Sequence, residues 1–280
     1  MLYLVATPIG NLEEITLRAI DVLKSVDLIA AEDTRHTAVL LNKYGITTRT
    51  VAYHKFNEKS SVGGLIAMLK EGKSIAVVSD AGMPTVSDPG HVVIDAAIEN
   101  GIEFTVVSGA CAGINALVLS GFDTRSFCLL GFLPEKNIDR KRYVEPYKTV
   151  PATLVFYSAV HDIKKDLAFL YEQFGARRVA VCREMTKMFE TVTRGTLGDE
   201  SDITEKGEFA VVVEGFKKAD YSDLTVAEHI LKYVESGVDL RAAVKNVAAD
   251  RGVAKSEVYK VAEELKSDGR IERRESDQIT

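Results

Sequence analysis

Short apolar runs alternate with amphipathic segments through residues 1–122. Residues 1–7 (MLYLVAT) and 74–80 (SIAVVSD) each hold consecutive apolar positions, as in strands that are buried on both faces. Between such runs, Leu17, Ile20 and Leu23 recur with the spacing of one helical face. The expected strands are residues 1–7, 27–33, 50–55, 74–80 and 103–109, and the expected helices are residues 11–26, 34–45, 60–72 and 90–101. This alternation predicts a parallel sheet with helices on both faces.

The pattern changes after residue 122. The expected strands 153–159, 178–185, 190–196 and 208–215 are separated by only one long helix, residues 161–175, which is typical of a second α+β unit. The segment 134–148 is polar and charge-dense, and it is either a mobile arm or a helix packed across the surface.

Three further helices are expected at residues 224–237, 239–252 and 254–269. A turn at Gly252 and a cap at Ser256 give the last two a helix-turn-helix pattern. Their charges nearly balance, which favours plain helical packing over DNA reading. We therefore expect an α/β domain over residues 1–122, a second over 123–218, and a helical extension over 219–280.

The composition, the cysteine spacing and the net charge limit the classes of protein to which the chain can belong. A hydrophobic content of 46% and a charged content of 27% are those of a globular protein, and no apolar run is long enough for a signal peptide or a membrane span. Cys111, Cys128 and Cys182 lack paired spacing and the five histidines are scattered, so we expect neither a disulfide framework nor a metal site. A reducing cytoplasm is the expected compartment. The net charge of −6 lacks the basic field of many nucleic-acid binders, so an RNA partner would need a local basic patch.

Several expected strands of the first domain end in turns of unusual composition. Pro8 and Gly10 follow the first strand, Glu32, Asp33 and Arg35 the second, and residues 79–90 (SDAGMPTVSDPG) the fourth. Gly109 and Gly113 follow the fifth. The ordinary alternative for residues 79–90 is a strand-to-helix connection, with Ser87 or Asp88 capping a helix near Pro89. Ligands of open parallel sheets bind beyond the carboxyl ends of the strands, and glycine lets them approach the backbone closely. These turns therefore predict a backbone-lined pocket.

Common ligand motifs do not match these turns. The first strand is not followed by G-x-G-x-x-G, and no P-loop lysine is present, which disfavours dinucleotides and triphosphates. A G-x-S-x-G nucleophile elbow is also absent.

The segments TPIGN (7–11), AEDTR (31–35) and SDAGMPTVSDPG (79–90) occur in that order. Together with REMTKMFETVTRGTL (183–197) and KGEFAVVVEG (206–215), they closely resemble the ribosomal small-subunit methyltransferase I family of the tetrapyrrole methylase superfamily. The resemblance covers most of residues 1–216, and the C-terminal helices resemble that family's small appendix. It implies two α/β domains with a cofactor cleft between them. It also implies methyl transfer from S-adenosylmethionine to the ribose 2'-oxygen of a 16S rRNA cytidine, by a homodimer.

The resemblance also implies the cofactor-binding residues. Besides Pro8 and Gly10, they are Asp80, Ala81, Gly82, Thr85, Val86, Cys111, Ala112, Tyr157, Ser158, Gly207, Phe209 and Ala210. Two loops depart from the family pattern: Ser108 replaces a proline ahead of Cys111, and Ser158 to Val160 replace Glu-Ser-Pro. These departures could alter cofactor affinity or substrate choice.

A ribose hydroxyl is a poor nucleophile at neutral pH, and a base or a cationic partner would accelerate its attack about 10²–10⁴-fold. The candidates are Asp33, Arg35, Glu184 and Lys187. The alternatives are a helix N-cap for Asp33, a surface charge for Arg35 and a solvated salt bridge for Glu184 and Lys187.

RNA contacts would have to come from local basic groups. The segment 134–148 interleaves basic and aromatic side chains, which suits phosphate contact and base stacking. The candidate RNA-binding residues are Arg140, Lys141, Arg142, Tyr143, Arg177, Arg178 and Arg194. A solvated arm is the alternative.

Two other functions stay open at this stage. One is methylation of a tetrapyrrole, which would require a wide, basic pocket for a substrate with many carboxylates. The other is a regulator that binds S-adenosylmethionine and reads DNA through the C-terminal helices.

Overall fold

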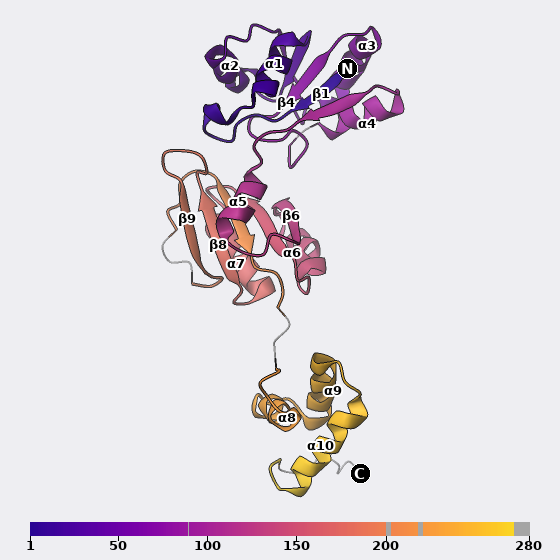
Figure 1. Ribbon diagram of the computed structural model, residues 1–280, viewed down its shortest axis with the longest axis vertical. Coiled ribbons are helices and arrows are strands. Elements are labelled where there is room, and N and C mark those ends of the chain that lie inside the picture. The colour runs from indigo at the N-terminus through magenta and orange to yellow at the C-terminus, as the bar shows by residue number, and fades with distance from the viewer. Residues whose placement is uncertain (89, 200–202, 218–220, 272–280) are drawn as a thin grey trace. The chain divides into compact units, whose positions relative to one another are not determined.

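The computed structural model describes residues 1–88, 90–199, 203–217 and 221–271 (Figure 1). Residues 1–216 form one compact unit, and the residues from 217 onward form another. The first unit contains both sheets, and the boundary expected between residues 218 and 219 lies outside the described residues.

The first sheet has the order β3-β2-β4-β1-β5, and every neighbouring pair is parallel. Its strands are β1 (Leu2–Val5), β2 (Leu28–Ala31), β3 (Thr50–Ala52), β4 (Ile75–Val78) and β5 (Phe104–Val107). The carboxyl ends of parallel strands lie at one edge of a sheet, so the turns after β1, β2, β4 and β5 lie close to one another.

Helices cover both faces of this sheet, as predicted. They are α1 (Leu17–Ser25), α2 (Thr34–Lys43), α3 (Glu58–Lys70) and α4 (His91–Glu99). Side chains alternate along each strand: Leu4 packs with the α3–α4 layer, whereas Val5 packs with the α1–α2 layer. The continuous helix expected over residues 11–26 is divided into a short 3₁₀ helix, η1 (Leu12–Glu14), and α1. It is divided because Asn11 and Thr16 each accept a backbone N–H as N-caps.

The second sheet has the order β6-β7-β10-β8-β9 and mixes pairings. Strands β6 and β7 are parallel, and the other neighbouring pairs are antiparallel. Its strands are β6 (Phe127–Phe132), β7 (Thr153–Ser158), β8 (Arg178–Arg183), β9 (Thr191–Thr196) and β10 (Phe209–Val213). Helices α6 (Asn137–Val144) and α7 (Ile163–Phe174) pack on one face, and α5 (Ala112–Ser120) packs on the other. Neither β6 nor α5 was expected from the sequence.

The charge-dense segment 134–148 contains a helix that packs on the second sheet. It comprises α6 and a 3₁₀ turn, η2 (Glu145–Tyr147). Arg140 of α6 is only 3% exposed, and its guanidinium lies 2.8 Å from the Asp166 carboxylate of α7. The prediction that Arg140 contacts RNA is therefore wrong, because this cation is held inside the protein by a buried carboxylate.

The C-terminal unit contains α8 (Val226–Glu235), α9 (Leu240–Arg251) and α10 (Lys255–Ser267). Gly252 adopts the left-handed conformation that ends α9, in agreement with the expected turn. The expected cap at Ser256 is wrong: α10 begins at Lys255, and its N-cap, Ala254, makes no side-chain cap hydrogen bond. None of the helices in the described residues is both long and apolar enough to cross a membrane.

The buried ion pair of α6 and α7 generates a stability prediction. Replacing Arg140 with alanine leaves Asp166 buried without its cation, which costs about 3–5 kcal/mol when one partner of a buried pair is removed. Arg142→Ala, an exposed position on the same helix, is the control and should change stability by less than about 0.5 kcal/mol. Urea unfolding measures both, and equal midpoints would show that the pair contributes nothing.

Candidate functional site

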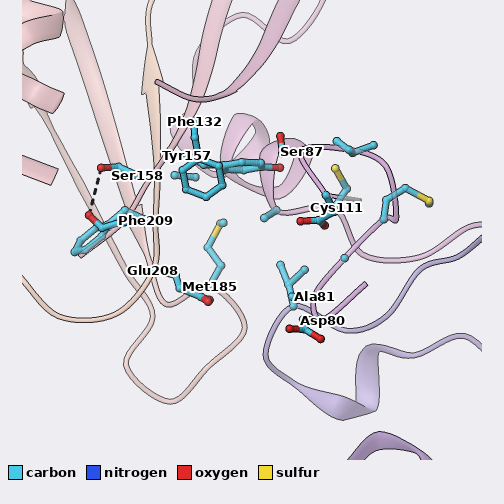
Figure 2. Close-up of a pocket in the computed structure, with 18 of the residues that line it drawn as sticks. Asp80, Ala81, Ser87, Cys111, Phe132, Tyr157, Ser158, Met185, Glu208 and Phe209 are labelled. Atoms are coloured by element: carbon cyan, nitrogen blue, oxygen red, sulfur yellow. Dashed lines mark hydrogen bonds between the residues drawn. The ribbon is translucent and has the colours of Figure 1, made fainter. Parts of the chain in front are cut away.

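A cavity of about 480 Å³ lies in the first unit, between the turns of the first sheet and the second sheet. Figure 2 shows Asp80 and Ala81 on one side of it and Met185 and Glu208 on the other. The lining residues are Ile9, Glu32, Asp80, Ala81, Gly82, Met83, Val86, Ser87, Asp88, Cys111, Ala112, Phe132, Tyr157, Ser158, Ala159, Val160, Met185, Gly207, Glu208, Phe209 and Ala210. Its volume falls in the range of about 300–1,000 Å³ that is usual for small-molecule sites.

The turn after β4 is fixed to the turn after β1. Thr7 and Gly82 exchange two backbone hydrogen bonds, of 2.9 Å and 3.1 Å, and the Thr7 hydroxyl donates to the Ser79 carbonyl. Gly82 has a φ of +84°, and the non-glycine residues Thr85 and Ser87 also have positive φ, at 74° and 69°. Such conformations cost about 1–3 kcal/mol each outside glycine and persist where the surroundings impose them.

The helix expected over residues 90–101 is present, whereas the alternative cap at Ser87 or Asp88 is not. Helix α4 starts at His91, and its N-cap is Gly90, which makes no side-chain cap hydrogen bond. Pro89 itself lies outside the described residues. Because neither Ser87 nor Asp88 caps the helix, both side chains are left to line the cavity.

Two glycines after β5, Gly109 and Gly113, lie so close to neighbouring side chains that a Cβ atom would not fit. A Cβ on Gly109 would lie 2.8 Å from the Ala6 Cβ, and one on Gly113 would lie 2.5 Å from Leu129 Cδ1. The Gly113 N–H donates to the Tyr157 hydroxyl at 3.0 Å, which links the first turn of α5 to the second sheet.

Aromatic and apolar groups form the wall contributed by the second sheet. The Phe132 and Tyr157 rings lie 5.5 Å apart between centroids, and burial raises the pKa of Tyr157 to about 12. Ser158 donates a 2.6 Å hydrogen bond to Asp166, so the cavity wall continues into the buried Arg140 ion pair.

Carboxylates crowd the wall contributed by the first sheet. The Glu32 carboxylate accepts the Asp80 N–H at 3.3 Å, and the Asp80 carboxylate accepts the Asp33 N–H at 3.0 Å. Burial, followed by the charge of Glu32, raises the pKa of Asp88 to about 6. Burial also raises the pKa of Glu32. A cationic ligand would neutralise this wall, whereas an anion would be repelled.

The structure brings most of the predicted cofactor residues together around this cavity. Those in the lining are Asp80, Ala81, Gly82, Val86, Cys111, Ala112, Tyr157, Ser158, Gly207, Phe209 and Ala210. Pro8, Gly10 and Thr85 are not in the lining, although Pro8 and Gly10 flank Ile9, which is.

The four catalytic candidates also lie outside the lining. Asp33 is the N-cap of α2, and hydrogen bonds from Arg35 hold its pKa far below the usual range. Lys187 donates to Glu184 at 3.0 Å and to Glu208 at 2.9 Å. Because Glu208 lines the cavity, the Glu184–Lys187 pair is connected to the cavity by this second hydrogen bond.

The candidate RNA-binding residues have different surroundings. Lys141 and Arg142 are exposed on α6, and Lys141 pairs with Glu172. The Tyr143 hydroxyl donates to the Leu130 carbonyl. The three other arginines also have internal partners: Arg177 donates to the Lys148 carbonyl, Arg178 pairs with Glu214, and Arg194 donates to the Leu119 and Ser120 carbonyls.

Sequence reasoning missed several residues of the lining. They are Ile9, Glu32, Met83, Ser87, Asp88, Phe132 and Met185, whereas Ala159, Val160 and Glu208 belong to segments that were expected at the cleft. Glu32 was recognised in its turn but not assigned to the pocket, and its position directly after a buried strand was the available signal. Phe132 and Met185 carried no comparable signal, because an apolar residue at a strand end is usually part of a core.

The sequence matches a family profile over much of its length and curated relatives over more than nine-tenths of it. The profile described as tetrapyrrole (corrin/porphyrin) methylases matches residues 1–200. The chain is 44% identical over 270 residues to the "Ribosomal RNA small subunit methyltransferase I" of Halalkalibacterium halodurans, covering 93% of each chain. It is 43% identical to the Bacillus subtilis protein of that name, covering 92% of each chain. It is 40% identical to that of Escherichia coli O157:H7, covering 93% of this chain and 94% of the relative.

Solved structures share the fold at lower identity. A diphthine synthase matches with a TM-score of 0.60 and 13% identity, covering 76% of this chain and 89% of its own. The uroporphyrin-III-C-methyltransferase of Thermus thermophilus matches with a TM-score of 0.54 and 23% identity, covering 76% of this chain and 93% of its own.

The raised pKa of Asp88 predicts a pH-dependent stability. The folded protein binds this proton more tightly than the unfolded chain, so the resulting stability is present below the ordinary value of 3.8 and lost as the pH rises to about 6. At pH 8, Asp88→Asn should therefore stabilise the protein by up to about 3 kcal/mol, less the part that solvent screens at this half-buried position, with no gain near pH 4. Urea unfolding across this range, with the exposed Asp95→Asn as control, measures the difference. A gain independent of pH would contradict the assignment.

Proposed function

This chain belongs to the ribosomal RNA small subunit methyltransferase I family of the tetrapyrrole methylases, and on that basis we propose that it methylates rRNA of the small ribosomal subunit. The donor would be S-adenosylmethionine, and the acceptor would be the ribose 2'-oxygen of a cytidine in 16S rRNA. The family membership rests on identities of 38–44% over more than nine-tenths of the chain.

The observation that carries the donor assignment is the charge of the cavity. Four carboxylates line it, those of Glu32, Asp80, Asp88 and Glu208, and the described lining residues include no lysine or arginine. S-adenosylmethionine carries a positive sulfonium, which suits this acidic wall. The residues present therefore fit the donor.

The cavity also offers groups for the uncharged parts of such a ligand. Phe132, Tyr157 and Met185 provide apolar surface, and the turn containing Ala81 and Gly82 brings backbone close to the space. Both halves of the wall are held by internal hydrogen bonds, so little reorganisation is needed on binding.

Bound S-adenosylmethionine supplies an activated methyl group. The chain has to align the ribose hydroxyl with that methyl group, and such alignment contributes roughly 7–11 kcal/mol to lowering a barrier. Methyl transfer would replace the donor's C–S bond with a C–O bond and release S-adenosylhomocysteine, so this chain would have to pass the hydroxyl proton to an acceptor.

We place the proton acceptor among the lining carboxylates or the groups hydrogen-bonded to them. Asp33 contacts Asp80 through its backbone N–H, and Lys187 contacts Glu208 through its ammonium group. Each of the four catalytic candidates therefore contacts a lining residue or contacts a residue that does so. Asp33, Glu184 and Lys187 contact a lining residue, and Arg35 contacts Asp33. Lys141, Arg142, Tyr143, Arg177, Arg178 and Arg194 stay candidates for RNA contact.

The charge of the cavity also separates this function from its alternatives. A tetrapyrrole with many carboxylates would be repelled by Glu32, Asp80 and Asp88. A DNA-reading regulator finds little support in the balanced charges of the last two helices. We further propose a homodimer acting in the cytoplasm, where ribosomal subunits are found.

Donor binding can be tested by filling the cavity. Titration calorimetry of the wild type with S-adenosylmethionine or S-adenosylhomocysteine should show saturable uptake. Ala81→Phe, a change at an exposed lining position, should weaken that affinity by about tenfold or more without lowering the thermal midpoint. Ala176→Phe, exposed and outside the lining, is the matched control. Absence of uptake by the wild type would remove the proposed donor.

The acceptor can be tested with labelled donor and two substrates. Purified 30S subunits from cells lacking this protein should accept label in rRNA as 2'-O-methylcytidine, whereas uroporphyrinogen III should not be labelled. Label in the tetrapyrrole alone would reverse the assignment.

A further inference from the structure

Two large apolar side chains are exposed side by side in the loop between β8 and β9. This β8–β9 loop comprises residues 184–190, and its Met188 and Phe189 are 91% and 66% exposed. Met185, three residues earlier, is only 8% exposed and lines the cavity. The loop therefore presents an apolar surface to solvent within a few residues of the site.

Hydrogen bonds among residues on the second-sheet side of the cavity hold this loop. Lys187 binds both Glu184 and Glu208, and the Thr186 N–H donates to the Glu190 carboxylate at 2.6 Å. Glu184 and Thr186 have positive φ values of 50° and 65°, which non-glycine residues adopt at a cost of about 1–3 kcal/mol each. Such a conformation persists because these contacts impose it.

The loop is also held by the turn after β1. The Asn11 N–H donates to the Thr186 hydroxyl at 3.0 Å. A Cβ on Gly10 would lie 2.6 Å from Lys187 Cγ, so the two segments are in close contact. The backbone that precedes Met188 and Phe189 is therefore held by contacts with the second sheet's loops and with the turn after β1.

We propose that Met188 and Phe189 form a stacking platform for an unpaired base of the rRNA, next to the nucleotide whose ribose enters the cavity. This inference rests on the proposed function. Proteins bind unpaired RNA by stacking its bases on exposed aromatic side chains, and a platform whose preceding backbone is already held loses less conformational entropy on binding. The loop offers no cation to a phosphate, because Lys187 is shared between Glu184 and Glu208 and the loop also contains Glu190. It therefore suits a base better than a phosphate.

Steady-state methylation of 30S subunits tests the platform. Phe189→Ala should raise the KM for 30S subunits by about 5- to 150-fold, the loss expected for one base–aromatic stack. Phe189→Tyr keeps the aromatic face and should restore the KM to within about threefold of the wild type. The calorimetric affinity for S-adenosylmethionine and the thermal midpoint should be unchanged in both variants.

Leu17→Ala is the matched control, because Leu17 of α1 is also apolar and 81% exposed but lies outside the β8–β9 loop. It should leave the KM unchanged. An unchanged KM for Phe189→Ala, or a defect that tyrosine does not repair, would overturn the proposal while leaving the proposed function intact. Failure of the wild type to bind donor or to label rRNA would instead remove the proposed function.

A second measurement distinguishes a base from a protein partner on the 30S subunit. A single-stranded oligoribonucleotide with one unpaired 2-aminopurine should lose fluorescence on binding the wild type, since stacking quenches this base. Phe189→Ala should quench it much less. Equal quenching by both proteins, together with a raised KM for 30S subunits, would indicate that Phe189 contacts a ribosomal protein and would overturn the proposal.

Discussion

The cavity depends on the packing of α5. This helix directly follows β5 of the first sheet, yet its buried residues Ala116 and Leu117 pack against the second sheet. Ile9, from the turn after β1, belongs to the same apolar cluster. Because one cluster contains residues from the turns of the first sheet and from the second sheet, these turns are held opposite the second sheet. The space between them is the cavity.

Glycine at two positions allows this arrangement. Gly109 lets the β5 turn pass against Ala6, and Gly113 lets α5 approach Leu129 and Tyr157. A side chain at either position would meet atoms closer than ordinary van der Waals contact. The backbone in these turns is therefore close to the cavity, and the Gly113 N–H is satisfied by a side chain of the opposite wall.

Charge is distributed unequally around the site. The wall from the first sheet is acidic, and burial, followed by the charge of Glu32, raises the pKa of Asp88. The wall from the second sheet is mostly aromatic and apolar, apart from Glu208 and from Ser158, which connects to the buried Asp166. An acidic wall facing an apolar one matches a ligand that is cationic at one point and flat or apolar elsewhere.

The sequence by itself determined the alternation of strands and helices, because apolar runs buried on both faces and capped amphipathic helices are local patterns. It also identified the β1, β2 and β4 turns, since proline, glycine and aspartate are conspicuous after a buried strand. It did not reveal α5, whose sequence AGINALVLS lacks a polar face. It also assigned Arg140 to the surface, because the sequence does not distinguish an exposed arginine from one that is buried in an ion pair. Only the tertiary structure decided that Arg140 meets Asp166, that Asp88 lines the cavity and that Phe132 and Met185 close it. Those facts depend on contacts between residues distant in sequence, which no local pattern encodes.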